Sequence, residues 1–288
     1  MNILVTGATG FIGNHVTTQL LSRGHTVTAV ARNQSRAVVA SWYEQATFIA
    51  ADIHDPATIK VLQSASFDAV IHLAWPDLPN YTSLVHLEKN LPAELIFLKN
   101  LVRQGIPRLL VAGTCFEYGL QQGCLNEGTS PAPVTPYAIA KNTLRLFLEA
   151  LKKDQPFCLQ WARLFYMHGK GQNPKSLLAQ LDAAIQSGET LFNMSGGEQL
   201  RDYLPVEKIA VHLVALAEHS TFDGIVNVCS GEPVSVRKLT EDHIARKGAA
   251  IKLNLGYYPY PEYEPMAFWG DSTLLSQLLI SVRNSHDK

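Results

Sequence analysis

The sequence predicts an α/β fold: a doubly wound parallel sheet with helices on both faces, followed by a smaller C-terminal lobe. Short apolar, β-branched runs alternate with helix-length amphipathic segments through the first 165 residues. The runs carry no polar alternation, as expected for strands that are buried on both faces. Beyond about residue 165 this alternation loosens, and loops with glycine and proline appear.

The expected strands are runs of mostly apolar or β-branched residues. They are Ile3–Thr6, Thr26–Ala31, Thr47–Ala50, Ala69–Leu73, Leu109–Gly113 and Cys158–Leu164. Between them, apolar residues recur at helical spacing. The expected helices are Ile12–Ser22, Pro56–Gln63, Leu84–Arg103 and Tyr137–Lys152. Parallel strands need a long crossover, so this alternation is typical of a parallel sheet.

In the second half, helical periodicity persists at Leu177–Gln186, Val206–Glu218 and Val236–Arg246. The glycine- and proline-bearing loops between them predict a smaller lobe built onto the sheet. One segment, Gly256–Pro265, is rich in tyrosine and proline. It fits equally a loop that contacts substrate and a packed surface loop.

Composition excludes several classes of protein. Hydrophobic residues make up 47% of the 288 residues, which excludes intrinsic disorder. Lys+Arg (24) and Asp+Glu (25) balance, so we expect no binding to nucleic acid or to an anionic membrane. No apolar run is long enough for a membrane helix, and we expect no signal peptide and a cytoplasmic location.

Cysteine and histidine spacing gives no sign of a metal centre. The four cysteines form no C-x-x-C pair, and we expect free thiols in a reducing compartment. They are Cys115, Cys124, Cys158 and Cys229. The histidines are scattered without ligand spacing, so we expect no metal.

A glycine loop follows the first strand and opens a helix, in the order Gly7-Ala8-Thr9-Gly10-Phe11-Ile12-Gly13. Such glycines let the backbone approach a pyrophosphate, while the helix N-terminus supplies N–H groups and a positive dipole. The Lys-Ser/Thr pair of a nucleoside triphosphate loop is missing. We therefore predict that Gly7, Gly10, Phe11, Ile12 and Gly13 bind a dinucleotide cofactor.

The end of the second strand bears on the choice of cofactor. Dinucleotide sites that hold a free ribose 2′-hydroxyl place Asp or Glu there. Here the position is Arg32, with Arg36 one helical turn later. A guanidinium suits a 2′-phosphate, which favours NADP(H) and leaves NAD(H) open. The alternative is that Arg32 is simply a solvated residue after the strand.

Tyr137 and Lys141 lie four residues apart and therefore on one helix face. An ammonium at that distance is expected to lower the pKa of the phenol, which makes Tyr137 a general acid/base for a sugar hydroxyl or ketone. Thr114 ends a buried strand, at the edge where parallel sheets bind ligands. Its hydroxyl is placed to donate a hydrogen bond to the reacting oxygen.

With these features the chain resembles extended short-chain dehydrogenase/reductases, of the NAD-dependent epimerase/dehydratase family that acts on nucleotide sugars. The matching stretches are 6–13, 51–53, 70–74, 113–119, 137–141, 163–169 and 197–206. The resemblance implies a Rossmann-type doubly wound sheet. It is closer to deoxysugar 4-ketoreductases than to epimerases across Phe116–Gly119 and Tyr166–Gly169.

The resemblance assigns roles to single residues. Thr114, Tyr137 and Lys141 match the catalytic triad, and Asn90 matches an asparagine that supports the lysine. Arg201 matches the arginine that binds the diphosphate, a bidentate task suited to a guanidinium. The cofactor contacts of the family are matched by Asp52 and Ile53 at the adenine, Leu73 and Ala74 along the channel, and Leu164 and Phe165 beside the nicotinamide, in addition to Tyr137 and Lys141.

Departures from the family pattern narrow the chemistry. Cys115 and Phe116 stand where 4,6-dehydratases and decarboxylases carry acidic residues, so neither activity is expected. Glu117 lies one position late and is interpreted as a helix-entry or turn carboxylate. Tyr166 replaces an asparagine of the substrate pocket, and His168 stands where tyrosine is common. Trp75 replaces a small residue, and we expect it either to form a wall of the pocket or to pack between the lobes. The expected substrate contacts are Trp75, Cys115, Phe116, Tyr166 and Arg201.

The resemblance also implies how the chain is organised. Residues 1–165, with returning segments at about 203–229, form the dinucleotide-binding domain. Residues 166–202 and 230–288 form the smaller nucleotide-sugar-binding lobe. Family members commonly dimerise through a four-helix bundle, and the helices Leu84–Arg103 and Tyr137–Lys152 match its positions. Leu95, Leu98, Leu144 and Phe147 are the expected contacts of a homodimer, although core positions facing the sheet have the same pattern.

Three functions remain. The first is reduction at C4 of a nucleotide-linked 4-keto-6-deoxyhexose, favoured by Arg32 and by the missing acidic pair. The second is a nucleotide-sugar 4-epimerase with tightly bound NAD. The third is a cofactor-binding regulator without activity, which the complete triad argues against. The nucleotide (dTDP, UDP, CDP or GDP) and the stereochemistry of the sugar stay open.

Overall fold

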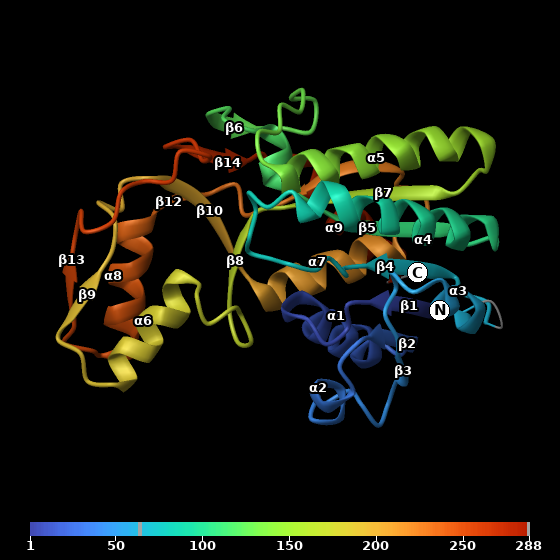
Figure 1. Cartoon of the computed structure of the whole chain (residues 1–288), viewed down its shortest axis with the longest axis horizontal. Coiled ribbons are helices and arrows are strands. Elements are labelled where there is room, and N and C mark those ends of the chain that lie inside the picture. Colours follow the sequence, from blue (N-terminus) through green and yellow to red (C-terminus); the bar gives the residue numbers. More distant parts are fainter. Residues whose placement is uncertain (63–64, 287–288) are drawn as a thin grey trace.

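The computed structural model describes residues 1–62 and 65–286 and is built on a seven-stranded sheet in the order β11-β7-β5-β4-β1-β2-β3 (Figure 1). Every neighbouring pair in this sheet runs parallel. Its strands are β1 (Asn2–Thr6), β2 (Thr26–Ala31), β3 (Thr47–Ala50), β4 (Ala69–His72), β5 (Arg108–Thr114), β7 (Cys158–Leu164) and β11 (Gly224–Val228). The predicted parallel α/β sheet is thus confirmed.

The sheet winds outward in both directions from β1, to β3 at one edge and through β4 to β11 at the other. The order therefore reverses between β1 and β4. In open parallel sheets, ligands bind beyond the carboxyl ends of the strands at such a reversal. This places the expected cofactor crevice beside the residues that follow β1 and β4.

Helices cover both faces of the sheet (Figure 1). On one face lie α1 (Phe11–Ser22), α7 (Val206–Glu218) and α9 (Thr273–His286); on the other lie α3 (Pro56–Leu62), α4 (Leu91–Arg103) and α5 (Pro136–Asp154). The short α2 (Gln34–Val38) follows β2. The predicted helix Pro56–Gln63 is observed to Leu62; Gln63 lies outside the described residues.

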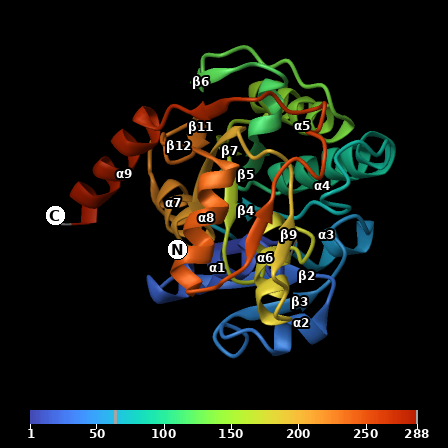
Figure 2. The same cartoon turned by 90° about the vertical axis from the view of Figure 1, so that its left-hand side faces the viewer.

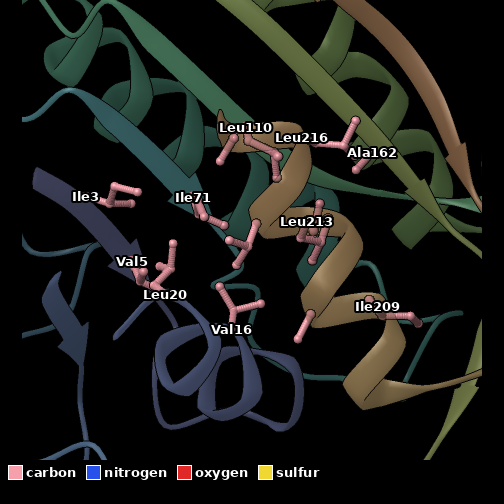
Figure 3. Close-up of a cluster of buried hydrophobic side chains, with 14 of the residues drawn as sticks. Ile3, Val5, Val16, Leu20, Ile71, Leu110, Ala162, Ile209, Leu213 and Leu216 are labelled. Carbon is pink, nitrogen blue, oxygen red and sulfur yellow. The ribbon is translucent and has the colours of Figure 1, made fainter. Parts of the chain in front are cut away.

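Alternate residues of each strand feed the two cores, because successive side chains point to opposite faces. Ile3 and Val5 of β1 pack toward α1 and α7, while Leu4 packs toward the other face. Figure 3 shows the first of these cores, where Val16 and Leu20 of α1 meet Leu213 of α7 beneath the strands. Strands with apolar residues on both sides therefore lack polar alternation.

One predicted helix is divided in the structure. The stretch expected to form one helix, Leu84–Arg103, contains a π-helical turn η1 (His86–Asn90) and then α4 (Leu91–Arg103). Pro92 stands in the first turn of α4 and has no N–H to continue the ladder of hydrogen bonds from the preceding turn. Asn90 lies at this junction, and π-turns recur at functional sites.

A smaller part of the molecule has its own core (Figures 1 and 2). Its helices are α6 (Leu177–Gln186) and α8 (Val236–Lys247). Its strands are β8 (Tyr166–His168), β10 (Leu200–Pro205) and β12 (Pro233–Ser235) in one sheet, and β9 (Leu191–Asn193) with β13 (Lys252–Asn254) in another. β6 (Gly123–Leu125) pairs with β14 (Phe268–Gly270). The domain boundaries remain a prediction. The last two residues of the predicted C-terminal lobe, 287 and 288, lie outside the described residues.

Two of the expected dimer contacts are wrong. Leu98 and Leu144 are 0% exposed and pack with Leu101 and Leu148 beneath the sheet, so they belong to the core of the single chain. Leu95 and Phe147 are half-buried. The apolar side chains that α4 and α5 do expose are Ile96, at 58%, and Leu146, at 51%.

Within residues 1–62 and 65–286, no helix is long and apolar enough to cross a membrane. All four cysteines are free thiols.

Candidate functional site

The glycine loop forms a tight cradle between β1 and α1. Gly7 has a φ of +72°, and its N–H donates to Val30 O at 2.9 Å. A Cβ on Gly7 would lie 2.8 Å from the backbone nitrogen of Ala74, and one on Gly13 would lie 2.1 Å from Gly7 O. The first turn of α1 holds no acidic residue and no side chain caps it. Such a bare helix N-terminus fits the pyrophosphate of a dinucleotide.

The predicted cofactor residues lie along the carboxyl edge of the sheet, from the cradle after β1 to the end of β7. Leu73 and Ala74 follow β4, and their N–H groups point to the O and Oγ1 atoms of Thr6. Phe11 and Ile12 form the first turn of α1. Leu164 ends β7 in register with Thr114. The Phe165 ring is buried against Tyr118 and Phe268, and the Phe165 N–H donates to Val228 O at 3.2 Å.

At the adenine end, Arg32, Asp52 and Ile53 lie at the ends of β2 and β3. Arg32 is exposed, and its charge acts on His54, which follows Ile53. Asp52 accepts the N–H of His54 at 3.0 Å, while Ile53 is buried. The structure therefore brings these three predicted residues to one corner of the crevice.

A row of buried polar side chains runs beneath the cofactor site, and sequence reasoning missed it. Thr6 Oγ1 lies 2.9 Å from His72 Nδ1, and His72 Nε2 lies 2.9 Å from Glu94 Oε2. Burial alone would raise the pKa of Glu94, but His72 and a hydrogen bond to His54 lower it to about 2. The feature of the sequence that could have revealed this row is Glu94, a carboxylate on the apolar face of α4.

Thr114 and Tyr137 meet at the carboxyl end of β5. Thr135 caps α5 by accepting the N–H of Ala138 at 3.3 Å, with Pro136 in the first turn, and this places Tyr137 at the start of the helix. The side chains of Tyr137 and Thr114 share a hydrogen bond. Both are almost completely buried, as is Lys141.

Lys141 is held by a carbonyl and by an aromatic ring. Its Nζ donates to Ala112 O at 2.9 Å and lies 4.0 Å from the centre of the Trp75 ring. Burial lowers the pKa of Lys141 to about 8, although Glu94 and Glu117 oppose the shift. Its ammonium therefore titrates near neutral pH.

The expected fall in the pKa of Tyr137 is not found. Burial raises this pKa above its usual value, and neighbouring Tyr81, Glu117 and Cys115 add to the rise. The reason is that a phenolate here would lose its water and meet groups of like charge. Tyr137 is consequently protonated, as a proton donor must be, but burial makes it a weaker acid than a solvated tyrosine.

The ring of Trp75 packs against Tyr137 and Lys141 of the predicted triad, and its role as a wall of the pocket remains a prediction. Its ring stacks on His86 at 6.3 Å and meets the edge of Tyr137 at 5.9 Å. Its Nε1 donates to His86 Nδ1 at 3.1 Å. Asn90 bonds to His86 and to Pro76 O, at 3.2 and 3.3 Å, so it reaches the cluster through His86.

The substrate side of the site is lined by aromatic rings. Tyr81 meets Phe116 at 5.0 Å and Tyr137 at 5.5 Å, and Phe116 meets Tyr166 at 6.1 Å. Tyr263, from the tyrosine- and proline-rich segment, lies 6.4 Å from both Tyr81 and Phe116. Sequence reasoning missed Tyr81 and Tyr263 as single residues, because both lie in irregular segments without periodicity.

Cys115 and Glu117 are buried beside this pocket. Burial raises the pKa of the Cys115 thiol, so it stays protonated. Glu117 accepts the N–H of Thr114 at 2.9 Å in a capping box, and it pairs with Arg163 at 2.8 Å. The interpretation of Glu117 as a turn carboxylate is confirmed.

Arg201 lies on β10 and pairs with Glu264 of the tyrosine-rich segment. Its Nη2 lies 2.8 Å from Glu264 Oε2. Its guanidinium carbon lies 4.8 Å from the Phe268 ring and 5.6 Å from the Tyr166 ring. Arg201 thus joins the aromatic pocket, but a carboxylate of the chain already occupies its donors.

No cluster suited to a metal accompanies these residues. Over the described ranges, no group of three or more His, Cys, Asp or Glu side chains is arranged to hold a metal ion. The candidate site therefore consists of the glycine cradle, the Thr114–Tyr137–Lys141 cluster and the aromatic pocket.

Comparison with known sequences identifies the family of this chain. A sequence model described as the NAD dependent epimerase/dehydratase family matches residues 3–229. The dTDP-6-deoxy-L-talose 4-dehydrogenase (NAD(+)) of Aggregatibacter actinomycetemcomitans is 31% identical, over 94% of this chain and 99% of that protein. A UDP-glucose 4-epimerase of Erwinia amylovora is 26% identical over 97% and 92%.

Solved structures share the fold. MoeE5 in complex with UDP-glucuronic acid and NAD superposes with a TM-score of 0.84 and 25% identity, over 97% of this chain and 92% of that one. A UDP-glucose-4-epimerase from Stenotrophomonas maltophila, with bound NAD and formylated UDP-arabinopyranose, gives a TM-score of 0.86 at 23% identity, over the same shares of the two chains.

Proposed function

The chain belongs to the NAD dependent epimerase/dehydratase family, and from this premise we propose that it reduces a nucleotide-linked 4-keto-6-deoxyhexose at C4. The observation that carries the proposal is Tyr137, held protonated against Thr114 in an aromatic pocket without an acid at 115 or 116. The 31% identity to a 4-dehydrogenase of a dTDP-6-deoxyhexose supports it. That reaction and the reduction are one hydride exchange run in opposite directions.

Each member of the cluster has a distinct task. Tyr137 donates its proton to the C4 oxygen of the sugar as that oxygen becomes an alcohol. The Thr114 hydroxyl, hydrogen-bonded to Tyr137, orients the same oxygen. The Lys141 ammonium offsets the negative charge that remains on the phenol. A nicotinamide dinucleotide bound with its pyrophosphate at the glycine cradle would supply the hydride.

The test is consumption of reduced cofactor. Purified protein is mixed with NADPH or NADH and a panel of nucleotide-linked 4-keto-6-deoxyhexoses, and the near-ultraviolet absorbance of the nicotinamide is followed. We expect stoichiometric loss with one sugar, and a rate about 10²–10⁴-fold lower in Tyr137→Phe. Tyr257→Phe, at an exposed tyrosine, is the matched control. Activity with no sugar of the panel would contradict the proposal.

For the cofactor, Arg32 favours NADP(H), with NAD(H) as the alternative. Its exposed guanidinium lies at the end of β2, where a 2′-phosphate would be met, and no acidic residue takes that place. Arg32→Ala is expected to raise the KM for NADPH and to leave that for NADH nearly unchanged. The relative from Aggregatibacter actinomycetemcomitans is named for NAD(+), and an equal response of both cofactors would favour NAD(H).

A 4-epimerase is the second candidate, favoured by the likeness to a UDP-glucose 4-epimerase over almost the whole chain. The same three residues would move the proton of the C4 hydroxyl, while a tightly bound NAD would take up and return one hydride at C4. Interconversion of UDP-sugars without added cofactor would support this function. A requirement for stoichiometric reduced cofactor would exclude it.

The protein is further proposed to form a homodimer through α4 and α5. Ile96 and Leu146 expose apolar surface on these helices, and a four-helix bundle would bury it. Leu146→Glu is expected to halve the mass measured by light scattering. A wild-type chain that is monomeric at the same concentration would contradict the bundle.

A further inference from the structure

Arg201 has all its guanidinium nitrogens engaged within the chain. Nε and Nη2 donate to Glu264 Oε2 at 3.2 and 2.8 Å. Nη1 donates to Leu200 O at 2.8 Å and to Met266 O at 3.4 Å. Arg201 is only 2% exposed. A phosphate therefore cannot pair with both Nε and Nη2 unless the acceptor that they share leaves.

Of these acceptors, Glu264 is the one that can leave. The carbonyls of Leu200 and Met266 belong to backbone that is itself paired, since Leu200 N donates to Met266 O at 2.8 Å. Glu264 is a side chain, 14% exposed, in the irregular segment between β13 and β14. Rotation of its side chain would free the two nitrogens that form the fork of Arg201.

The segment that carries Glu264 also reaches the catalytic pocket. Tyr263, the preceding residue, meets the rings of Tyr81 and Phe116. The negative charge of Glu264 is felt inside the pocket, where, after burial, it raises the pKa of Tyr166 and Tyr203. One strap, residues 257–264, thus connects the fork of Arg201 to the side chains that surround Tyr137.

We propose that Glu264 is an internal ligand of the diphosphate subsite, and that the diphosphate of a nucleotide sugar must displace it from Arg201. The inference rests on the proposed nucleotide-sugar function. A carboxylate and a phosphate compete for the same charge-assisted donors, and their like charges keep both from sharing the fork. Displacement releases the strap beside Tyr137, which couples diphosphate binding to access to the pocket.

The consequence is an affinity reduced by the fraction of molecules in which the fork is free. The affinity of every ligand that uses the fork is reduced by the same factor. Ligands that do not reach Arg201, such as a nucleoside or NAD⁺, are unaffected. This difference separates competition by Glu264 from a general loss of structure.

The experiment measures binding by calorimetry to wild type, Glu264→Gln and Glu264→Ala, with UDP, dTDP, CDP and GDP as probes. We expect the diphosphate that binds wild type to bind Glu264→Gln about tenfold more tightly, equal to about 1.4 kcal/mol. Glu262→Gln is the matched control, because it removes an exposed charge two residues away on the same strap. The corresponding nucleoside and NAD⁺ should bind all variants equally.

A second measurement covers the case in which neither Glu264 variant folds. Hydrogen exchange of wild type is followed with and without the diphosphate, and peptides covering 257–264 should exchange faster when it is bound. Unchanged exchange there would overturn the inference.

The outcomes separate the inference from the function on which it rests. Equal diphosphate affinity in wild type and Glu264→Gln overturns the displacement of Glu264 and leaves a nucleotide-sugar enzyme in place. Failure of all four diphosphates to bind both proteins overturns the proposed function as well. Tighter binding of the nucleoside too would also overturn the inference, because the effect would then not be confined to the fork.

Discussion

Lys141 is a buried cation whose charge depends on its immediate neighbours. Ala112 O accepts one of its protons, and the face of Trp75 lies 4.0 Å from Nζ. A cation over an aromatic face gains about 0.5–2 kcal/mol, and more where water is excluded. Trp75 therefore favours the ammonium that burial disfavours, and it keeps the charge that Tyr137 needs after it gives up its proton.

The first prediction concerns pH. Because the pKa of Lys141 is lowered to about 8, the ammonium is present below that pH and is lost above it. We expect kcat to fall as pH rises through about 8. Trp75→Leu keeps the site dry but removes the π face, so the alkaline limb should move to lower pH by about one unit or less.

The measurement is a pH–rate profile of wild type, Trp75→Leu and the control Trp269→Leu. An alkaline limb that stays in place in Trp75→Leu would show that the ring does not support the charge.

The second prediction concerns Glu117, which belongs to a buried hydrogen-bond network beside Thr114. Its carboxylate accepts from Thr114 N, Trp161 Nε1 and Arg163 Nε, all inside the protein. Glu117→Gln would turn an amide N–H₂ toward these donors and leave the Arg163 charge unpaired. We expect a loss of about 3–5 kcal/mol in the free energy of unfolding.

Urea unfolding measures this loss. The control is Glu241→Gln, which breaks an i,i+4 pair with Arg237 at the surface and should cost far less. Similar losses for the two variants would contradict a structural role for Glu117.

Single residues were predictable where a spacing or a strand end specified them. Tyr137 and Lys141 share a helix face by their spacing, and Thr114 ends a buried strand. Glu264 and Tyr81 had no such pattern, because irregular segments bring them to the pocket from distant parts of the chain. The pKa of Tyr137 was predicted in the wrong direction, since burial depends on the whole fold rather than on one neighbour.

The glycine loop shows how an element depends on absent side chains. Gly13 packs against the turn at Gly7, and a Cβ there would lie 2.1 Å from Gly7 O. We expect Gly13→Ala to push α1 away from the turn and to weaken cofactor binding about 100-fold or more, equal to about 2.7 kcal/mol.

Fluorescence titration with NADPH and NADH measures this effect. Gly128→Ala is the control, because its Cβ would come no closer than 3.2 Å to another atom. Unchanged cofactor affinity in Gly13→Ala would show that the loop is only a turn between strand and helix.

Elements were predicted best where periodicity was strong. The strands Thr26–Ala31, Thr47–Ala50 and Cys158–Leu164 begin and end as predicted. The helix expected at Leu84–Arg103 was divided. The spacing of apolar residues predicts a continuous helix, but it does not show that Pro92 lacks the backbone N–H needed to continue the helical hydrogen bonds. Two of the expected dimer contacts, Leu98 and Leu144, failed for a related reason: they belong to the apolar stripe of α4 and α5 that faces the sheet.

At the level of the whole molecule, alternation of strand and helix was sufficient to predict the parallel sheet and its crevice. It could not predict that residues 257–264 return from the smaller part to lie against Tyr81 and Phe116. Such a return depends on tertiary contacts of a loop and leaves no period in the sequence. The cofactor half of the site was therefore predictable in more detail than the substrate half.

The central claim is net reduction at C4, and transfer of isotope tests it most directly. The protein is mixed with reduced cofactor carrying deuterium at the transferable position and with the nucleotide-linked 4-keto-6-deoxyhexose on which it acts, and the product is analysed by NMR. The account predicts one deuterium at C4 of the sugar for each cofactor oxidised, and none in Tyr137→Phe. A keto sugar that gains no deuterium while an unmodified UDP-sugar inverts at C4 without taking up deuterium would contradict it and identify an epimerase.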